Sequence, residues 1–296
     1  MDERLFANLA AWLEHEAVVL ASVIETRGAT PRKRGARMLV TASDSAFSIG
    51  GGLAEGRVVE IARRLLETGA VSEVVELDLG GGVDAAGICG GRMRLALRRW
   101  EGEADRLRAR GVADQLASGD HVALEESDLG IAVAAEFALP EPRLLIVGAG
   151  HCGEALYRLA RQLGFDVRIQ DSREACFASN CYEPAHVLRG EVSRLVEALE
   201  TARPVFVVLL NRDFHADVEA LGVLCRYRPA FLGMMGSRRR IATVRAALPQ
   251  FETELASLVA PVGIDIGAQT PEEIAVSILA QLIAVRCTHS DGDSVD

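Results

Sequence analysis

The sequence predicts an α/β protein in two parts: an N-terminal mixed α+β domain over residues 1–138 and a Rossmann-like domain with a doubly wound parallel sheet over 143–287. In the second part, apolar runs alternate with stretches of helical period, which is the pattern of βαβ units. Between the parts, residues 136–142 carry two prolines where the pattern changes. The polar residues 288–296 are expected to form a flexible tail.

The composition is that of a globular protein. Of 296 residues, 49% are hydrophobic and 25% are charged, which excludes disordered and fibrous classes. The net charge of −10 gives no overall attraction to nucleic acid. The acidic start does not resemble a signal peptide, and no apolar run reaches the length of about 18 residues that a membrane span needs. The 6 cysteines form no CxxC pair, so we expect no zinc ribbon and a cytoplasmic protein with reduced thiols.

The elements of the N-terminal part follow from hydrophobic periodicity. Apolar residues three and four apart predict a helix over 3–14, and a glycine turn leads into a second helix over 48–69. A hairpin is expected over 121–135, around the turn SDLG. Runs of β-branched and apolar residues predict extended segments over 17–25, 36–41, 71–77 and 92–100.

The C-terminal part is more regular. Strands are expected over 143–148, 165–171, 185–188, 203–210 and 229–236, with a further extended segment over 258–265. Helices are expected over 150–164, 194–200, 213–227, 237–248 and 270–286. The last helix has a clear start, because Thr270 as N-cap, Pro271 at N1 and Glu273 at N3 form a capping box.

The first motif with a chemical meaning is GAGHCG, which follows a strand and opens a helix. Gly148 permits the tight turn, Gly150 lets the backbone approach a pyrophosphate, and Gly153 lets helix and strand pack closely. His151 at the helix start is either a hydrogen-bond donor to phosphate or an ordinary first-turn residue. The motif predicts a Rossmann-type half that binds a dinucleotide, another phosphate ligand or none.

An acidic residue at the end of the second Rossmann strand normally accepts a hydrogen bond from a ribose hydroxyl. Asp171, in the sequence IQDSR, occupies that position. Ser172 and Arg173 follow it, so recognition of a phosphorylated ribose, as in NADP, stays open. The crevice is therefore a candidate NAD(P) site.

A second motif, GMMGSRRR, joins a strand to a helix, where an anion site can form. We interpret Ser237 as the N-cap and Arg238 as the phosphate ligand. Arg239 and Arg240 are interpreted as a solvated helix face.

The sequence NRDFHAD follows the strand VFVVLL, at a position that lines the ligand crevice in an open α/β sheet. Asp213 and His215 are candidates for a catalytic pair. Capping by Asp213 and a surface position for His215 explain the same residues equally well.

The sequence ICGG places Cys89 beside Gly90 and Gly91, where a thiol is accessible and reactive unless it is buried. Arg92 and Arg94 are two apart on a strand, so they share one face, and their charge would favour the thiolate if they lie near. Most of the other cysteines are interpreted as core residues; they are Cys152, Cys176, Cys181, Cys225 and Cys287.

Two further loops, TPRKRGAR and IGGG, combine arginines with glycine backbone. Arg32 and Arg37 in the first loop, with the amides of Gly50, Gly51 and Gly52 in the second, suit an anionic ligand with several oxygens. Turn geometry and solvated charge are the alternative explanation.

Taken together, these residues resemble the XdhC/CoxI family of xanthine dehydrogenase accessory proteins. The resemblance extends from about Leu5 to Arg286. The stretches that carry it are ETRGATPRKRGARMLV, SIGGGLAE, ICGG, VGAGHCGEAL, LNRDFHADVEAL, FLGMMGSRRRIATVR and APVGIDIGAQTPEEIAVSILA.

The resemblance implies a chaperone that binds and protects the molybdenum cofactor (molybdopterin) and supports its sulfuration by a cysteine desulfurase. It also implies that the cofactor is inserted into a client molybdenum hydroxylase of the xanthine dehydrogenase or CO dehydrogenase type. A homodimer is implied, as is an accessory factor rather than an enzyme with its own turnover. Many members carry two adjacent cysteines, but here Ile88 precedes Cys89, which leaves the client open.

Within this family we expect Cys89 to contact the molybdenum, because a thiolate is a soft ligand. The glycine turns and arginines would hold the phosphate and the pterin. An NAD(P)-dependent oxidoreductase and a nucleotide-sensing regulatory protein are the competing interpretations. The oxidoreductase is weakened because the chain has no Tyr-x-x-x-Lys pair, and its one lysine, Lys33, lies outside the Rossmann half.

Overall fold

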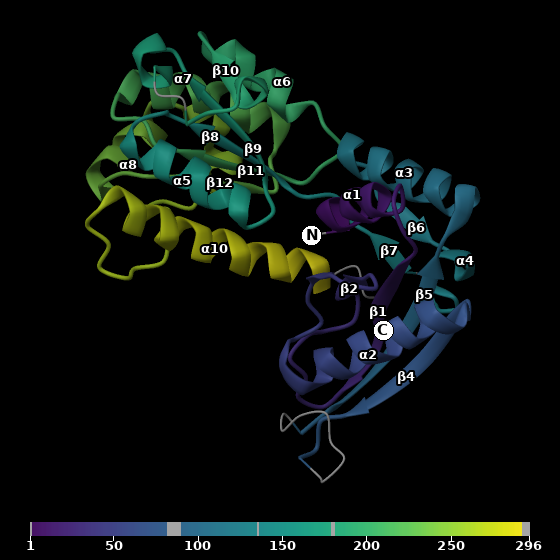
Figure 1. Ribbon diagram of the computed structural model, residues 1–296. Helices are drawn as coiled ribbons and strands as arrows, with labels where there is room; N and C mark the ends of the chain where they lie inside the picture. Colours follow the sequence, from purple (N-terminus) through teal and green to yellow (C-terminus); the bar gives the residue numbers. More distant parts are fainter. Residues whose placement is uncertain (1, 82–89, 135, 179–180, 292–296) are drawn as a thin grey trace. The chain divides into compact units, whose positions relative to one another are not determined.

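The structure is a computed structural model that describes residues 2–81, 90–134, 136–178 and 181–291 (Figure 1). The chain forms two compact units, Met1–Pro140 (unit 1) and Glu141–Asp296 (unit 2). Each unit has its own sheet and hydrophobic core. In the part of the chain that is described, no helix is both long and apolar enough to cross a membrane.

Unit 1 mixes helices with antiparallel strands. Its elements are α1 (Asp2–Trp12), β1 (Val18–Arg27), β2 (Arg37–Val40), β3 (Ser45–Phe47), α2 (Gly52–Thr68), β4 (Ser72–Asp78), β5 (Arg92–Trp100), α3 (Gly102–Ser118), β6 (Val122–Leu124), α4 (Glu126–Leu129) and β7 (Glu136–Ala138). The main sheet has the order β3-β2-β1-β5-β4, and β6 pairs separately with β7. Helix α2 covers one face of the main sheet, and α1 and α3 cover the other (Figure 1).

Strand β1 is buried on both faces, which explains why its sequence is apolar without polar alternation. Val19, Ala21 and Val23 pack under α2. Val18 and Leu20 face the opposite way, toward α1 and α3. The strand therefore joins the two hydrophobic clusters of the unit.

Helix α3 lies where no element was expected. Its sequence is rich in charge, and its buried residues are Ala109, Val112 and Leu116. These three positions are too few, in a strongly polar stretch, to give a clear hydrophobic period. The helix is held instead by packing against α1 and the hydrophobic cluster that α1 forms on the sheet.

The expected hairpin over 121–135 is wrong in its turn and its second strand. SDLG ends the short helix α4, and the partner of β6 is β7, which begins at Glu136. The cause is Asp128, which accepts a hydrogen bond from the Glu125 backbone N–H at 2.9 Å and two from Arg108 of α3, at 3.0 and 2.6 Å. These bonds favour a helical turn over a tight hairpin.

Unit 2 is a doubly wound α/β unit. Its strands are β8 (Arg143–Val147), β9 (Asp166–Asp171), β10 (Val187–Arg189), β11 (Val205–Leu209) and β12 (Phe231–Met234). Its α-helices are α5 (His151–Gln162), α6 (Leu195–Leu199), α7 (Phe214–Tyr227), α8 (Arg238–Ala246), α9 (Glu252–Leu255) and α10 (Pro271–Asp291), with short 3₁₀ turns between some of them. The strands are parallel in the order β10-β9-β8-β11-β12, so the predicted fold class is confirmed.

Side chains of the central strands alternate between two cores. Leu145 and Val147 of β8 pack with α7 and α8, while Leu144 and Ile146 pack with α5 and α10. Such strands are buried on both faces, as parallel sheets require. The chain order reverses between β8 and β11, and a ligand crevice forms at such a reversal in this kind of sheet.

Helix α10 begins with the predicted capping box. Glu273 accepts hydrogen bonds from the backbone N–H groups of Gln269 and Thr270, and the Thr270 hydroxyl accepts one from the Glu273 N–H. The helix extends through Asp291, past residue 288, where the tail was expected to begin. The segment 258–265 forms an isolated bridge between Gly233 and Val259 rather than a strand.

A buried ion-pair cluster closes unit 1 beside the first helix. The guanidinium of Arg37 is nearly inaccessible and donates to Asp2 at 2.8 Å and to Glu136 at 2.9 Å. Arg34 donates to the second oxygen of Glu136 at 3.1 Å. Arg37 is therefore not available to an anionic ligand, which corrects the expectation that its guanidinium contributes to such a site.

We predict that Arg37→Ala lowers the free energy of unfolding of unit 1 by about 3–5 kcal/mol, because it leaves two carboxylates without their buried partner. Both tryptophans of the chain, Trp12 and Trp100, lie in this unit, so urea unfolding followed by tryptophan fluorescence measures it. Arg27→Ala is the matched control: its side chain is 80% exposed, and a change below about 0.5 kcal/mol is expected. Equal effects of the two substitutions would contradict the structural role of Arg37.

Candidate functional site

A cavity lies at the carboxyl ends of the parallel strands of unit 2. Its volume is about 450 Å³. The residues that line it are Ala149, Gly150, His151, Cys152, Gly153, Glu154, Arg173, Ala175, Cys176, Leu210, Arg212 and Met235. They follow strands β8, β9, β11 and β12, so the cavity is the crevice that the strand order predicts.

Each glycine of the GAGHCG turn has a different environment. Gly148 has a φ of +115°, which an L side chain rarely adopts. A Cβ on Gly153 would lie 2.0 Å from the Gly148 carbonyl oxygen, so helix and strand meet only because it is glycine. A Cβ on Gly150 would meet no atom within 4 Å. The space beside Gly150 is therefore open to a ligand at the N-terminus of α5, as a pyrophosphate requires.

Asp171 lies at the end of β9 and is 5% exposed. Its carboxylate accepts from the Ala149 backbone N–H at 2.8 Å and from the Arg173 backbone N–H at 2.9 Å. The Arg173 guanidinium adds two more bonds, at 2.9 and 2.7 Å. Burial opposes ionisation, but the hydrogen bonds from Arg173 and Ala149 outweigh it and lower the pKa of Asp171. Asp171 thus ties the glycine turn to Arg173.

The cavity also contains two thiols that were interpreted as core residues. Burial raises the pKa of Cys152 against the opposing charge of Arg212. Burial, and then the neighbouring Asp171 carboxylate, raise the pKa of Cys176. Both side chains are partly buried: they line the cavity and also pack against the hydrophobic core, as the sequence predicted. Cys225 is buried in the core, as predicted.

The GMMGSRRR segment is organised by Arg240, not by a solvated face as expected. Its guanidinium pairs with Asp217, which is 1% exposed, and donates to the carbonyl oxygens of Arg212 and Asp213, both at 2.9 Å. Burial raises the pKa of Asp217, and Arg240 opposes that shift. The clamp holds the loop after β11, whose Arg212 lines the cavity. Sequence pattern alone could not distinguish Arg240 from the arginines before it.

Two neighbouring interpretations have different outcomes. The Ser237 hydroxyl accepts from the Arg240 backbone N–H at 3.3 Å, so its role as N-cap is confirmed. Arg238 is exposed and is not among the described residues that line the cavity, so its role as a phosphate ligand stays a prediction. His151 is the first residue of α5 and is exposed to the cavity.

The proposed catalytic pair is not assembled in the structure. The Asp213 carboxylate accepts a hydrogen bond from the backbone N–H of His215 at 2.9 Å and caps α7. The His215 side chain is exposed, and its ring contacts Phe214. The geometry favours the capping interpretation over a catalytic one.

In unit 1, the glycine-bearing loops meet at one end of the main sheet. A Cβ on Gly91 would lie 2.3 Å from the Ala29 carbonyl oxygen, so the start of β5 and the loop after β1 touch backbone to backbone. A Cβ on Gly50 would lie 2.5 Å from the Pro31 side chain. The loop carrying TRGATPR thus neighbours both Gly91 and the IGGG turn, although these segments are far apart in the sequence.

The glycine turn before α2 is hydrogen-bonded to a carboxylate in the first turn of that helix. Gly50, Gly51 and Gly52 all have positive φ, and a Cβ on either of the last two would meet no atom within 4 Å. The Glu55 carboxylate accepts hydrogen bonds from the Gly51 N–H at 2.9 Å and from the Ser48 hydroxyl at 2.8 Å. The turn therefore presents open backbone on one side and is braced by Glu55 on the other.

The remaining predicted residues of unit 1 surround this cluster. Arg32 is exposed, and its Cγ lies 3.7 Å from the position of a Cβ on Gly50. Gly90 has a φ of +83° and open space where a side chain would lie. Cys89, the predicted molybdenum ligand, lies outside the described residues.

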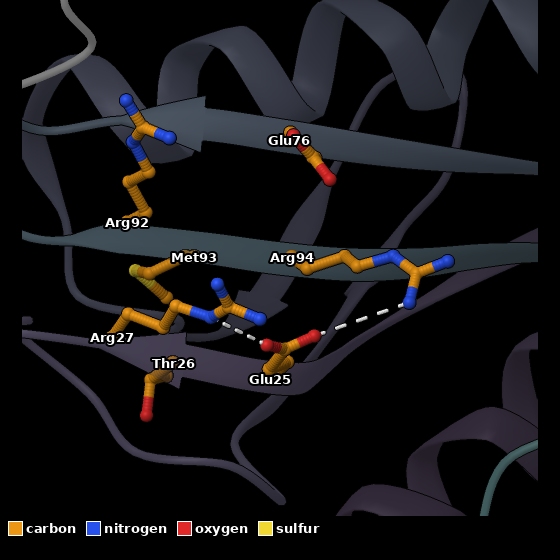
Figure 2. A pocket seen from close by; sticks show the side chains of 7 residues that line it. All are labelled: Glu25, Thr26, Arg27, Glu76, Arg92, Met93 and Arg94. Carbon is orange, nitrogen blue, oxygen red and sulfur yellow. Dashed lines mark hydrogen bonds and ion pairs between the residues drawn. The ribbon is translucent and has the colours of Figure 1, made fainter.

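A charged hollow of about 120 Å³ lies on the sheet beside these loops (Figure 2). Glu25 and Arg27 of β1 lie on it with Arg92 and Arg94 of β5, which share one face as predicted, and Glu76 of β4. Arg27 donates to Glu25 at 2.8 Å, and Arg94 lies 4.0 Å from the other Glu25 oxygen. The sequence analysis missed Glu25 and Arg27, although cross-strand pairing with Arg94 and Arg92 was a usable signal.

The folds of the two units define a class of protein: a Rossmann-type unit with an open crevice, preceded by an α+β unit with convergent glycine loops. Models of two families match the chain, the XdhC and CoxI family over residues 11–78 and the XdhC Rossmann domain over 144–282. The chain therefore belongs to the XdhC and CoxI family.

Known relatives agree with this assignment. YqeB of Escherichia coli (strain K12), an uncharacterised protein, is 30% identical over 94% of this chain. A protein of Bacillus subtilis (strain 168) that is named as a probable xanthine dehydrogenase subunit is 28% identical over 50% of this chain. The chain spans 45% and 44% of the lengths of these two relatives. A crystal structure described as a xanthine dehydrogenase from Bacillus halodurans is 25% identical, with a TM-score of 0.81 over 97% of this chain and 96% of that one.

We predict that Gly150→Val leaves unit 2 folded, at a cost of about 1 kcal/mol for a poorer N-cap, and abolishes binding of pyrophosphate ligands such as ADP-ribose. Gly153→Ala, the matched change in the same motif, should instead destabilise the unit by about 3 kcal/mol, because its Cβ has no space. Calorimetric unfolding and isothermal titration separate the two effects. Unchanged ligand affinity in Gly150→Val would rule out a ligand site in the crevice.

Proposed function

We propose that this protein is an accessory factor that binds the molybdenum cofactor, protects it, supports its sulfuration and delivers it to a molybdenum hydroxylase. The observation that carries the proposal is the meeting of three family motifs at one end of the unit 1 sheet, through the Gly91–Ala29 and Gly50–Pro31 contacts. Cys89 directly precedes the glycine pair of one of these motifs. The open backbone faces of the glycines and an exposed arginine are then available to one ligand, and we propose that Cys89 adds a thiol.

The residues of unit 1 fit such a cofactor. Gly51, Gly52 and Gly90 expose backbone in directions where a Cβ would meet nothing within 4 Å, so a flat or bulky group can approach closely. Arg32 is exposed beside them and suits a phosphate. When bound, the cofactor would supply the molybdenum centre that the client requires. The chain's own part would be to hold the phosphate and pterin and, through Cys89, to contact the metal end.

The family and the names of the relatives point to the partners. A relative named as a probable subunit of xanthine dehydrogenase supports a client of that type, and a CO dehydrogenase type is the alternative. A cysteine desulfurase is the proposed sulfur donor, because sulfuration needs a persulfide source. A cytoplasmic location is part of the same proposal.

A second candidate function is favoured by the crevice of unit 2. Open backbone at Gly150 and the Asp171–Arg173 pair suit an NAD(P)-type nucleotide, as in an oxidoreductase or a nucleotide-sensing regulatory protein. The capping role of Asp213 and the exposure of His215 favour a structural role for these residues over a catalytic pair. We therefore favour a binding or sensing role for the crevice over hydride-transfer chemistry.

We predict that Cys89→Ser folds normally, retains much less molybdenum cofactor than the wild type and fails to activate the client hydroxylase, because the soft ligand is lost. Protein purified from a molybdenum-replete host is assayed for metal and for pterin oxidation products. Cys181→Ser removes a thiol from unit 2 and serves as the control. If Cys89→Ser holds the cofactor as tightly as the wild type and still activates the client, the site assignment is wrong.

We also predict a homodimer in solution, as the family resemblance implies. The apolar face of α10 is not its interface, because Ala275, Ile278, Leu279 and Leu282 are buried in the core that α10 shares with α5. Light scattering at micromolar concentration should give twice the mass of the chain. A monomeric mass would contradict the prediction.

A further inference from the structure

The hydrogen bonds of Asp171 leave no acceptor site for a ribose. A carboxylate accepts about four hydrogen bonds, two on each oxygen. Oδ1 of Asp171 accepts from the backbone N–H and the Nε of Arg173, and Oδ2 accepts from the Ala149 N–H and the Nη2 of Arg173. Both oxygens are therefore fully used by groups of the protein itself.

This saturation changes what the crevice can select. A dinucleotide with a free ribose diol normally donates its hydroxyl hydrogens to the carboxylate at this position. Here such a ligand would first have to break the bonds from Arg173 to a carboxylate that is 5% exposed. A ribose diol thus competes with an ion pair that is already in place.

Arg173 is the group that faces the ligand instead. It lines the cavity, and its side chain is 59% exposed although two of its nitrogens are bound to Asp171. Its Nη1 has no protein acceptor among the described residues. The guanidinium is therefore held in a fixed orientation with donors to spare, which is the arrangement that favours phosphate over hydroxyl ligands.

We propose that the crevice of unit 2 selects a nucleotide whose ribose carries a phosphate monoester, and that Arg173, positioned by Asp171, is the residue that reads this phosphate. The pyrophosphate would lie at Gly150 and the N-terminus of α5, and the ribose phosphate at Arg173. Nearby, Arg189 and Glu174 form an ion pair, so their charges cancel. Among the residues that line the cavity, Glu154 is the acidic one. The inference rests on the second candidate function, a nucleotide in the crevice, and is independent of the molybdenum cofactor.

Isothermal titration of the full chain with NADP⁺ and NAD⁺ tests the proposal. We expect NADP⁺ to bind at least about tenfold more tightly than NAD⁺. Adenosine 2′,5′-bisphosphate and adenosine 3′,5′-bisphosphate, compared with ADP, then distinguish a 2′-phosphate from a 3′-phosphate. Equal affinity for NADP⁺ and NAD⁺, preference for NAD⁺, or no binding of any of these nucleotides would overturn the proposal.

Three variants locate the effect. Arg173→Gln should remove the preference for the phosphate and strengthen NAD⁺ binding, because it frees acceptor sites on Asp171 for the ribose diol. Arg173→Lys should restore part of the preference, because lysine keeps the charge but not the fork. Arg158→Gln is the control: it removes the same charge from the exposed side of α5, and it should keep the preference. Circular dichroism establishes that each variant is folded.

Two outcomes separate this inference from the other proposals. A preference that survives in Arg173→Gln would overturn the role of Arg173, and NADP⁺ binding that survives in Gly150→Val would place the nucleotide outside the crevice and overturn the proposal. Loss of molybdenum cofactor binding in Cys89→Ser bears only on the function proposed for unit 1. A wild-type protein that prefers NADP⁺ but carries no molybdenum cofactor would support the inference and contradict the chaperone.

Discussion

In both units, the loops that form the candidate sites come together backbone against backbone, at distances that leave no room for a Cβ atom. A Cβ on Gly153 would lie 2.0 Å from the Gly148 carbonyl oxygen, and one on Gly91 would lie 2.3 Å from that of Ala29. The first contact seats α5 on β8 and so places the helix N-terminus at the crevice. The second brings the start of β5 against the loop after β1. Gly150 differs from both, because a Cβ there would meet no atom within 4 Å and the space beside it is open to a ligand. The same residue type therefore builds the site at some positions and leaves it accessible at others.

Local signals predicted much of this structure, and some of what they missed depends on tertiary ion pairs. The hydrophobic period predicts the alternating elements of unit 2, and the capping box at Thr270 and Glu273 forms as its spacing requires. The SDLG segment, by contrast, becomes helical because Asp128 meets Arg108 of a helix that periodicity did not predict. Asp171 has the position expected of a ribose-binding residue, yet its carboxylate is already bonded to an arginine two residues on. Contacts of this kind depend on distances in the folded chain, which a sequence pattern does not contain.

The arginine-rich composition has a structural explanation in part. All but one of the 32 Lys and Arg residues are arginine, and several of them clamp carboxylates rather than bind ligands. Arg37 holds Asp2 and Glu136, and Arg240 holds Asp217 together with two backbone carbonyls. A planar guanidinium with several donors suits these positions better than an ammonium group does. The number of arginines near glycines thus overstates the number available to an anion.

The bond between Glu55 and the Gly51 N–H has a consequence for release as well as for binding. An anionic group that reaches this amide meets a carboxylate already attached to it at 2.9 Å, so the two negative charges contend for one donor. The free energy needed to displace Glu55 reduces the binding free energy of the incoming group. When that group leaves, the Glu55 carboxylate returns to the same amide. The Gly51 N–H then has a hydrogen-bond acceptor even without a ligand. Under the proposed function, such an internal competitor would lower the affinity of the turn for an anionic group, which suits a carrier that has to give up what it holds.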